Sequence, residues 1–354
     1  MNEIKKIGVL TSGGDAPGMN AAVRAVCRTA LARGIEVMAI YRGYSGLIEG
    51  DIKPMEIRAV SNVINKGGTI LYSDRCPEFK EKEVRAKAIA NCKKLGIDGI
   101  VCIGGDGTFQ GATKLTEEGV PCIGIPATID NDITSTDNTI GFDTAMNTVI
   151  ELVDKLRDTC ESHARCNVVE VMGRGAGDIA LNTAIASGAT AVVVPEFPHS
   201  DDSICKKIKR ARELGKRNFI VIVSEGVGSE YAPALAKKIQ DETGVETKFA
   251  RLAHIVRGGN PTLKDRILGS KMGVYAVEEL LRGNSNKVIC ERNGDICAVD
   301  IAYSHVIDRM YKGKLTEGEL DRFSAEEIQR MKDEIEEKKS ELLALYTVEN
   351  KINL

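Results

Sequence analysis

The sequence predicts an α/β protein built from two doubly wound, mostly parallel sheets, followed by a C-terminal helix. Short runs rich in Val and Ile alternate with longer amphipathic stretches over most of the chain. The short runs are apolar throughout, which is typical of parallel strands covered by helices on both faces. Glycine directly follows several of these runs, as it does where backbone closes around a ligand at the carboxyl edge of a parallel sheet. A length of 354 residues favours two domains.

The individual elements follow from this alternation. Parallel neighbours need a crossover, and a helix between successive strands supplies it. Helices are expected where apolar side chains recur at the helical period, at residues 20–33, 81–95, 144–157 and 203–214. Buried strands are expected at residues 6–10, 36–40, 99–103, 122–125, 168–171, 191–194 and 219–223.

The C-terminal segment is more charged than the rest. Ser324 and Glu327 form a capping-box pattern that predicts the start of a helix. Lys338 and Lys339 interrupt its apolar stripe, which favours a packing or subunit-contact helix over a coiled coil. The apolar positions of this stripe are Ile328, Met331, Ile335, Leu342 and Leu345.

Composition excludes several classes of protein. The chain is 43% hydrophobic and 28% charged with a net charge of −3, so no nucleic-acid partner is expected. No apolar run approaches the roughly 20 residues that span a bilayer, and the N-terminal residues predict no signal peptide. Ten cysteines without a C-x-x-C pair predict reduced, buried thiols in a cytoplasmic protein rather than disulfides or a zinc site.

Glycine-rich turns mark the expected ligand site. They lie at residues 12–15, 104–107, 172–175 and 257–259, and four of them suggest a large, phosphate-rich ligand. The chain contains no G-x-x-x-x-G-K-[ST] motif, which excludes a P-loop ATPase, and no G-x-G-x-x-G after a strand, which argues against a dinucleotide oxidoreductase.

The strongest local motif is the Gly-Gly-Asp-Gly-Thr sequence at 104–108, between a strand and a helix expected to begin near Thr108. Backbone N–H groups at a helix N-terminus hold phosphate oxygens, and Asp106 there can position Mg²⁺. Thr108 would serve as the N-cap or as a phosphate donor. An ordinary Asp-Gly turn with a Thr N-cap is the alternative interpretation.

A second motif follows the next strand, at residues 126–132. Asp130 could take the proton from an attacking hydroxyl, while Asp132 orients a metal or a water. A solvated Asn-Asp turn is the alternative. The preceding Gly-Gly-Asp-Gly turn favours a functional site, because the two loops should lie side by side.

Together these motifs make the chain similar to the bacterial-type 6-phosphofructokinases. The matching segments are residues 8–20, 103–108, 128–132, 169–174 and 254–259, and they occur in the family's order across about residues 4–310. NAD kinases and lipid kinases share Gly-Gly-Asp-Gly-Thr, but they lack the segments at 128–132 and 254–259.

The resemblance implies Mg²⁺-assisted, ATP-dependent phosphorylation of fructose 6-phosphate at its 1-hydroxyl, the committed step of glycolysis. Asp130 would be the base, helped by Thr128, and Asp132 would lie beside them. Arg75 and Arg174 would stabilise the charge in transit. Asp106 would lie on the metal. The residues implied to bind ATP are Gly14, Tyr44 near the adenine, Arg75, Cys76, Gly105, Asp106, Gly107 and Thr108.

The resemblance also implies a homotetramer with shared active sites. Arg165 and Lys248 would reach the sugar phosphate from a neighbouring subunit. An effector of the ADP or phosphoenolpyruvate type would bind at Arg24, Arg28, Arg157, Gly188 and Lys216. The remaining sugar-phosphate residues would be Thr128, Ile129, Asp130, Met172, Gly173, Arg174, Glu225, His254 and Arg257.

Some positions depart from the family's pattern. Gly107 and Ala127 favour ATP, because diphosphate users of this fold typically place Asp and Lys there. Ala127 nonetheless replaces the usual Gly. In the effector pocket Ile57, Asn62 and Thr190 replace an Arg, an acidic residue and a Glu, and Lys248 replaces a substrate-phosphate Arg. A diphosphate-dependent enzyme and a catalytically silent nucleotide-binding protein of the same fold are the alternatives.

The resemblance also suggests how the chain is divided. Residues 1–140 and 255–305 would form the ATP-binding domain. Residues 141–254 and 306–322 would form the fructose-6-phosphate-binding domain, and residues 323–354 would be a helical extension.

Overall fold

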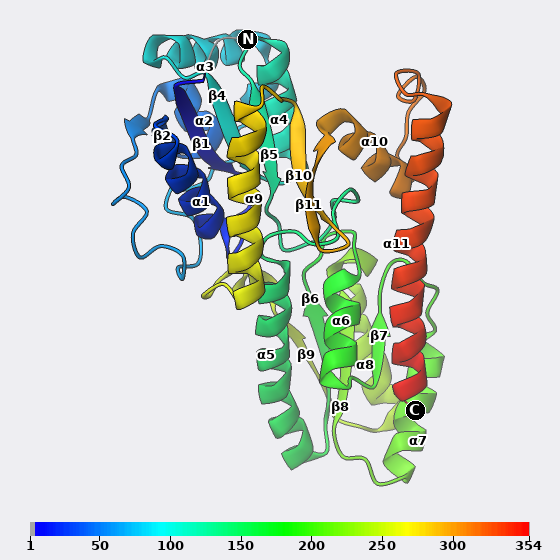
Figure 1. Cartoon of the computed structure of the whole chain (residues 1–354). Coiled ribbons are helices and arrows are strands. Elements are labelled where there is room, and N and C mark those ends of the chain that lie inside the picture. The colour runs from blue at the N-terminus through cyan, green and yellow to red at the C-terminus, as the bar shows by residue number, and fades with distance from the viewer. Residues whose placement is uncertain (1–3, 354) are drawn as a thin grey trace. The chain divides into compact units, whose positions relative to one another are not determined.

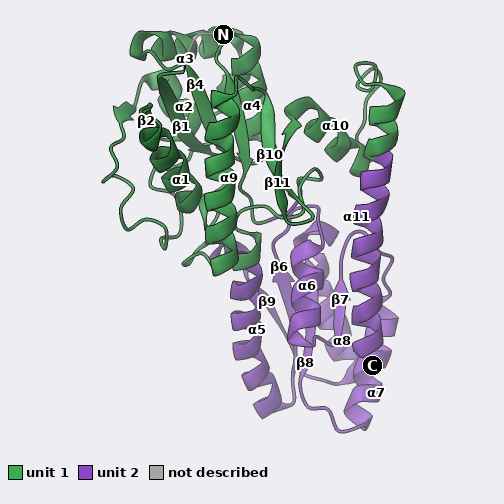
Figure 2. Ribbon diagram, in the orientation of Figure 1, with its two compact units in different colours: residues 1–129, 133–144, 257–331 green, residues 130–132, 145–256, 332–354 purple. Residues whose placement is uncertain are grey.

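The computed structural model of the chain describes residues 4–353. They form two compact units, each with its own sheet (Figures 1 and 2). Unit 1 contains the residues up to 129 together with 133–144 and 257–331. Unit 2 contains residues 130–132, 145–256 and those from 332 onward.

Unit 1 is built on a seven-stranded sheet with the order β11-β10-β5-β4-β1-β2-β3. All neighbours are parallel except the edge pairs β2–β3 and β10–β11. The strands are β1 (Lys6–Ser12), β2 (Glu36–Ile40), β3 (Ile52–Pro54), β4 (Gly99–Gly104), β5 (Cys122–Pro126), β10 (Lys287–Arg292) and β11 (Asp295–Asp300).

Helices cover both faces of this sheet. One face packs on α2, α3 and α4, and the other on α1 and α9. Small residues let α1 and α9 approach closely, since a Cβ added at Gly273 would lie 2.7 Å from Ala25 Cβ. The helices are α1 (Met19–Ala32), α2 (Gly43–Glu49), α3 (Lys82–Leu95), α4 (Asp106–Glu117), α9 (Leu263–Leu281) and α10 (Ile301–Tyr311), with a 3₁₀ turn η1 (Pro77–Lys80).

Unit 2 has a four-stranded, all-parallel sheet with the order β7-β8-β6-β9. Helices α7 and α8 pack on one face in an aliphatic core, and α6 also lies against β7 and β8. The strands are β6 (Cys166–Val171), β7 (Ala191–Val193), β8 (Phe219–Ser224) and β9 (Thr247–Arg251). The helices are α6 (Asp178–Ser187), α7 (Asp201–Glu213) and α8 (Tyr231–Thr243), with 3₁₀ turns η2 (Glu225–Val227) and η3 (Ala253–Arg257).

Two helices have residues in both units: α5 (Phe142–His163) and α11 (Ala325–Ile352). The capping box of α11 is confirmed, because Glu327 N donates to Ser324 Oγ at 3.2 Å and Ser324 N donates to Glu327 Oε2 at 2.8 Å. Lys338 interrupts the apolar stripe as predicted, because it is half-buried on the same face as buried Ile335 and Leu342. Lys339, by contrast, is exposed.

The doubly wound, mostly parallel fold predicted from the sequence is confirmed, with a strand at each predicted position. Four strands were not predicted. β3 has only three residues, and β9 is mostly polar and exposed. The β10–β11 hairpin turns at Asn293-Gly294, where both residues have positive φ. An Asn-Gly pair between apolar runs is a known hairpin signal and could have revealed this hairpin.

Several parts of the predicted domain division differ from the two units: residues 130–132 lie in unit 2, residues 141–144 lie in unit 1, and the expected extension is divided between the units at residue 331. Residues 306–322 were expected in the second domain, but they lie in unit 1. The reason is that α10 packs against α4, β10 and β11.

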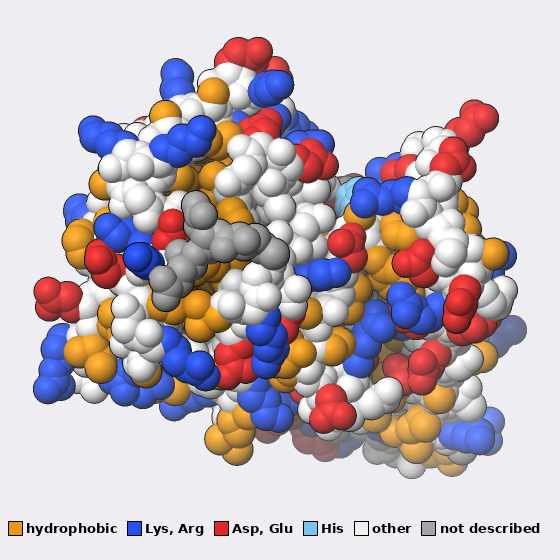
Figure 3. Space-filling view, turned by 45° about the horizontal axis from the view of Figure 1, so that its top comes forward, with side chains coloured by type: hydrophobic (Ala, Val, Ile, Leu, Met, Phe, Trp, Pro, Cys, Tyr) orange, Lys and Arg blue, Asp and Glu red, His pale blue; other side chains and the backbone are white. Residues whose placement is uncertain are grey.

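None of the helices among residues 4–353 combines the length and the apolar character needed to cross a membrane. Basic and acidic side chains are interspersed over the face shown in Figure 3.

A buried carboxylate joins two helix N-termini in unit 1. Asp265, in the first turn of α9, accepts hydrogen bonds from Gly141 N at 2.8 Å and from Thr144 N at 2.9 Å. It also accepts one from the Thr144 hydroxyl. Thr262, the N-cap of α9, returns the contact by donating its N–H to Thr144 Oγ1 at 3.0 Å. The start of α5 and the start of α9 therefore hold each other.

We predict that Asp265→Asn lowers the free energy of unfolding by roughly 2–3 kcal/mol, because an amide NH₂ then faces buried donors and leaves them unsatisfied. Urea unfolding followed by far-UV circular dichroism measures this. Asp154→Asn, on an exposed position of α5, is the matched control and should change stability little. Equal stabilities of the two variants would show that Asp265 is not an anchor.

Candidate functional site

The carboxyl ends of three neighbouring strands in unit 1 form the first part of the site. In the registers of β1, β4 and β5, Ser12 pairs with Gly104 and Gly104 pairs with Pro126. Ala127 N donates to Gly104 O at 3.0 Å. The Gly-Gly-Asp-Gly turn and the start of the segment after β5 therefore lie side by side, which confirms this part of the prediction.

The turn between β4 and α4 has little room at its start and open space beyond it. A Cβ on Gly104 would lie 2.4 Å from both Ser12 O and Thr108 Oγ1, so the packing itself requires glycine there. A Cβ on Gly105 or on Gly107 would meet nothing within 4 Å. The fold does not demand glycine at these two positions, which leaves their backbone open to a ligand.

The expectation that Thr108 is the N-cap of the helix is wrong. The helix begins at Asp106 with Gly105 as its N-cap, and Thr108 N already donates to Gly105 O at 2.9 Å. The Thr108 side chain is buried, and its hydroxyl donates to Ser12 O at 3.2 Å. Thr108 therefore ties α4 to β1 instead of capping the helix.

Asp106 is held by two side chains of unit 1. Its Oδ1 lies 3.0 Å from His305 Nδ1, and its Oδ2 accepts from Gln110 Nε2 at 2.9 Å. Burial alone would raise the pKa of Asp106, but the hydrogen bond and charge of His305, with a smaller contribution from Gln110, bring it below its usual value. His305 could not be predicted from the sequence, because a lone histidine on a helix carries no motif.

The donor set around Asp106 fits Mg²⁺ bound together with phosphates. Among residues 4–353 there is no cluster of three or more His, Cys, Asp and Glu side chains that could hold a metal alone. Mg²⁺ commonly binds through one or two carboxylates plus substrate phosphates. Asp106, partly exposed at the first residue of α4, is placed for that mode.

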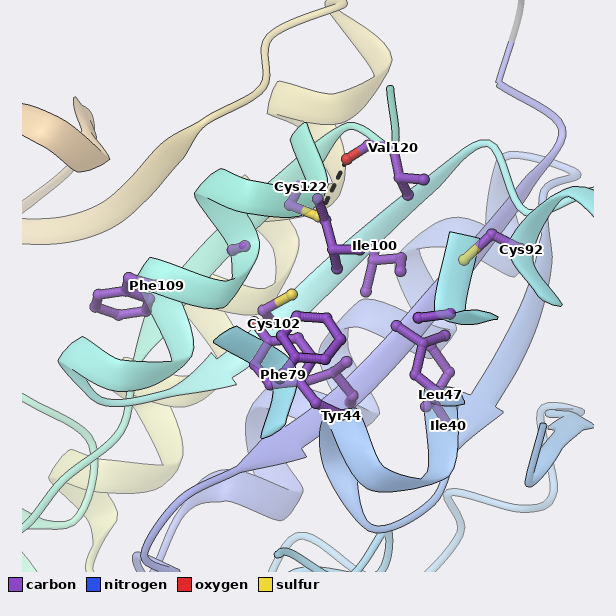
Figure 4. Close-up of a cluster of buried hydrophobic side chains, with 14 of the residues drawn as sticks. Ile40, Tyr44, Leu47, Phe79, Cys92, Ile100, Cys102, Phe109, Val120 and Cys122 are labelled. Atoms are coloured by element: carbon purple, nitrogen blue, oxygen red, sulfur yellow. Dashed lines mark hydrogen bonds between the residues drawn. The ribbon is translucent and has the colours of Figure 1, made fainter. Parts of the chain in front are cut away.

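Tyr44, which is expected near the adenine, lies in the core beneath the first turn of α4. Its ring is buried in the core and stacks on Phe79 with 4.1 Å between centroids (Figure 4). Its hydroxyl donates to Thr108 O. Burial raises the pKa of Tyr44 well above its usual value, which keeps the hydroxyl protonated as a donor. Tyr44 therefore supports the first turn of α4 from inside.

A second segment lies along the glycine turn after β1. Gly13 N donates to Asp74 O at 3.4 Å, which brings the following residue, exposed Arg75, to the same edge. Cys76 is half-buried, and burial raises the pKa of its thiol. Of the residues assigned to ATP, Gly14, Arg75, Cys76 and 105–107 therefore gather in unit 1.

Arg257, expected at the sugar phosphate, also lies in unit 1. Its Nη1 donates to Asp15 O at 3.2 Å, and the same atom would lie 2.6 Å from a Cβ on Gly14. Glycine at position 14 is thus what lets the guanidinium lie against this turn. Arg257 is placed among the residues assigned to ATP.

The segment after β5 carries the proposed acid–base residues. The Thr139 hydroxyl donates to Thr128 O at 2.6 Å, which fixes the start of the segment. Asp130 is buried, with 4% of its surface exposed. In unit 2, Asp132 Oδ2 lies 3.6 Å from Arg174 Nη1, so two residues from separate motifs meet.

The turn after β6 is shaped by a carboxylate from the next strand. Glu225 follows β8 and accepts hydrogen bonds from Arg174 N at 2.8 Å and Gly173 N at 3.2 Å. Arg174 has a φ of 58°, a conformation that these bonds help to hold. The Arg174 side chain is 71% exposed, so its guanidinium can reach a ligand. His254, in η3 after β9, is exposed as well, which excludes a core histidine.

Arg165 and Lys248 lie at the opposite edge of the same sheet. Arg165 precedes β6, whereas Met172 follows it, so a full strand of roughly 20 Å separates them. Glu246 joins the two cations: its Oε2 lies 2.7 Å from Arg165 Nε and its Oε1 2.9 Å from Lys248 Nζ. These hydrogen bonds lower the pKa of Glu246 to about 2. The sequence analysis did not identify Glu246.

Three of the expected effector residues gather at the end of α6. Arg157 donates to the Ser187 carbonyl, next to the Gly188 C-cap. Lys216 donates to Thr190 Oγ1 at 3.4 Å, and burial followed by the charge of Arg157 lowers the pKa of Lys216. The remaining two, Arg24 and Arg28, lie on α1 in unit 1.

Comparison with known proteins identifies relatives over most of the chain. Residues 6–280 match the family described as Phosphofructokinase. The ATP-dependent 6-phosphofructokinase of Bacillus licheniformis is 53% identical over 314 residues, covering 87% of this chain and 98% of the relative. That of Bacillus subtilis is 54% identical over 298 residues, covering 84% of this chain and 93% of the relative.

Solved structures agree with this fold. Phosphofructokinase from Saccharomyces cerevisiae superposes with a TM-score of 0.83 at 35% identity, covering 87% of this chain and 46% of that chain. A pyrophosphate-dependent phosphofructokinase from Marinobacter aquaeolei gives a TM-score of 0.74 at 24% identity, covering 84% of this chain and 83% of that chain, which is a likeness of fold.

We predict that Tyr44→Phe lowers the free energy of unfolding of the ligand-free protein by about 1 kcal/mol, because the buried Thr108 carbonyl loses its donor. Tyr72→Phe is the control, since Tyr72 is 64% exposed. Urea titration of both variants measures the difference. A Tyr44 whose hydroxyl faced only a nucleotide would leave this stability unchanged.

Proposed function

The chain belongs to the phosphofructokinase family, and on this premise we propose that it transfers the γ-phosphate of ATP to the 1-hydroxyl of fructose 6-phosphate. The products are fructose 1,6-bisphosphate and ADP. The observation that carries the proposal is an identity of 53% to an ATP-dependent 6-phosphofructokinase over 98% of that relative's length. The three strand ends of unit 1, with their glycine turns and Asp106, supply the phosphate-binding edge such a reaction needs.

ATP is proposed to lie along this edge. The residues proposed to hold or border it are Gly14, Tyr44, Arg75, Cys76, Gly105, Asp106, Gly107 and Thr108. When bound, Mg²⁺ supplies charge that offsets the phosphate oxygens, and Asp106 would hold it. The open space at Gly105 and Gly107 supports this assignment, because backbone N–H groups at the start of α4 can then reach phosphate oxygens directly.

Chemistry is assigned to the segment after β5. Asp130 would accept the proton of the sugar 1-hydroxyl, with Thr128 beside it. Arg174 and Arg75 would stabilise charge on the transferred group. The contact between Arg174 and Asp132 supports this arrangement, because it holds the guanidinium near the segment that carries the base.

Fructose 6-phosphate is proposed to bind at the carboxyl edge of the unit 2 sheet. Glu225 would act partly by shaping the turn from Met172 to Arg174. The residues proposed to contact the sugar phosphate from this chain are Thr128, Ile129, Asp130, Met172, Gly173, Arg174, Glu225, His254 and Arg257.

A neighbouring subunit is proposed to complete the site. Arg165 and Lys248 are separated by a full strand from Arg174 of the same chain, so the three cannot bind one phosphate together. This separation supports a homotetramer in which Arg165 and Lys248 act on a neighbour's substrate. Glu246 would keep the two cations side by side until a phosphate replaces it.

Regulation and location complete the proposal. An ADP- or phosphoenolpyruvate-type effector is proposed to bind at Arg24, Arg28, Arg157, Gly188 and Lys216. The cluster around Lys216 supports a site for an anion. A cytoplasmic location is supported by the ten cysteines, all of them free thiols.

We predict that Asp130→Asn lowers kcat by roughly 10²–10⁴, since the amide has the same shape but cannot take the proton. The KM values should change little. A coupled assay of fructose 6-phosphate phosphorylation measures both quantities, and Asp241→Asn on the exposed side of α8 is the control. If kcat falls by less than about fivefold while KM rises, Asp130 is a binding residue and not the base.

The phosphoryl donor is tested at Gly107. ATP should exceed diphosphate by orders of magnitude in kcat/KM, and Gly107→Asp should lower kcat/KM for ATP by roughly 10² or more, because its carboxylate repels nucleotide phosphates. Open space at this position predicts that the variant folds normally. Gly107→Ala adds the Cβ without the charge and should retain most activity. Equal turnover of diphosphate and ATP by the parent enzyme would overturn the assignment of the donor.

A further inference from the structure

The helix α11 lies outside the family match, which ends at residue 280. From residue 332 onward it belongs to unit 2 (Figure 2). Its inner face is anchored there: Ile335 and Leu342 are buried, and Tyr346 stacks on Phe197 with 4.3 Å between ring centroids. These contacts fix the rotation of the helix about its axis, and therefore fix which side chains face the unit.

One position on this inner face is occupied by a lysine. Lys338 lies between Ile335 and Leu342 at helical spacing, where packing alone would favour an apolar side chain. A half-buried cation must find polar partners to offset the loss of water. Lys338 Nζ lies 3.5 Å from the carbonyl oxygen of Asn131, between Asp130 and Asp132. The ammonium group of Lys338 thus faces residues 130–132, the segment proposed to carry the base.

The surroundings of Lys338 are acidic. Burial raises the pKa of both Asp178, at the first residue of α6, and Glu196. The positive charge of Lys338 acts in the opposite direction on both groups. Glu196 Oε1 accepts from Gly177 N at 2.8 Å, while its Oε2 is buried and has no hydrogen-bond partner. The negative charge of Asp132 adds to the repulsion on Asp178. Lys338 therefore offsets a local excess of negative charge.

The backbone of Asn131 connects Lys338 to the two carboxylates proposed to take part in the reaction. Asn131 has a φ of 51°, which is a left-handed conformation. Asn tolerates this conformation better than most residues, but contacts with the surroundings must hold it. Its carbonyl faces Lys338, and its side chain hydrogen-bonds Asp178. The conformation of Asn131 determines the directions in which the side chains of Asp130 and Asp132 point. A change of charge at Lys338 would therefore be transmitted to both carboxylates.

We propose that Lys338 is a positioning residue for the reaction, holding the 130–132 segment in place by contacting the Asn131 carbonyl and balancing Asp132, Asp178 and Glu196. The proposal rests on the proposed function, because it presupposes that Asp130 is the base. Through this one side chain, a helix beyond the family match takes part in catalysis without touching substrate.

The test compares four single-residue variants in the full-length chain. Lys338→Met keeps the length of the side chain and removes the charge, and its apolar chain suits the stripe, so the fold should persist. We expect kcat to fall roughly 10–100-fold, the scale of a misplaced catalytic group, with KM for fructose 6-phosphate changing less than about threefold. Lys338→Arg should retain most of kcat. Lys338→Gln serves as a second neutral variant should Lys338→Met fail to fold. Lys339→Met, whose exposed lysine pairs with Glu336 at 3.1 Å, is the matched control and should behave as the parent.

Two readouts separate positioning by charge from a merely structural role. Arg174 still faces Asp132 in Lys338→Met, but the balance against Asp178 and Glu196 is lost. The pKa of the catalytic base should then rise, so the acidic limb of the kcat–pH profile should move to higher pH. Adding Glu196→Gln to Lys338→Met removes one of the unbalanced negative charges and should restore part of the lost kcat and shift the profile back.

The outcomes distinguish this proposal from the proposed function. A parent chain that does not phosphorylate fructose 6-phosphate, or an Asp130→Asn variant that remains active, refutes the proposed function itself. If the parent is active and Asp130→Asn is not, the proposal is overturned when neutral variants at 338 match Lys339→Met in kcat and pH profile. It is also overturned when Lys338→Arg loses as much activity as they do.

Discussion

The geometry of the candidate site depends on the hydrogen bonds that the buried carboxylate of Asp265 accepts. The carboxylate accepts hydrogen bonds from Gly141 and Thr144, and so joins the start of α5 to the start of α9. At its other end, the segment after β5 begins with Ala127 N bonded to Gly104 O. The chain between these two points, which includes Asp130, is thus held at both ends by hydrogen bonds within unit 1. A catalytic group needs such support, because small displacements cost large factors in rate.

The glycines of this edge divide into two kinds with different physical causes. Gly104 is required by the fold, since a Cβ there would collide with Ser12 and Thr108. Gly105 and Gly107 face open space, so no contact within the chain explains the absence of a side chain. In the proposed function, their small size leaves the backbone accessible to the phosphates of ATP.

Features with a local sequence pattern could be predicted, and features without one could not. Seven strands of the two sheets follow from apolar runs, and the neighbouring loops at 104–108 and 126–132 follow from the parallel arrangement of β4 and β5. His305 and Glu246 are single residues on a helix and beside an edge strand, and nothing local distinguishes them. Tyr44 is assigned to the nucleotide by the resemblance, and only the structure shows that its ring stacks on Phe79 in the core.

By itself, the sequence determined the fold class, seven of the strands, the glycine turns at strand ends and the family, because hydrophobic periodicity and contiguous motifs are local properties of the chain. Only the tertiary structure decided which distant side chains meet. It placed His305 on Asp106, Arg174 on Asp132, and Lys338 beside Asn131. The physical reason is that such contacts depend on how helices are rotated and packed against their sheets, and side-chain packing across the whole unit sets that rotation.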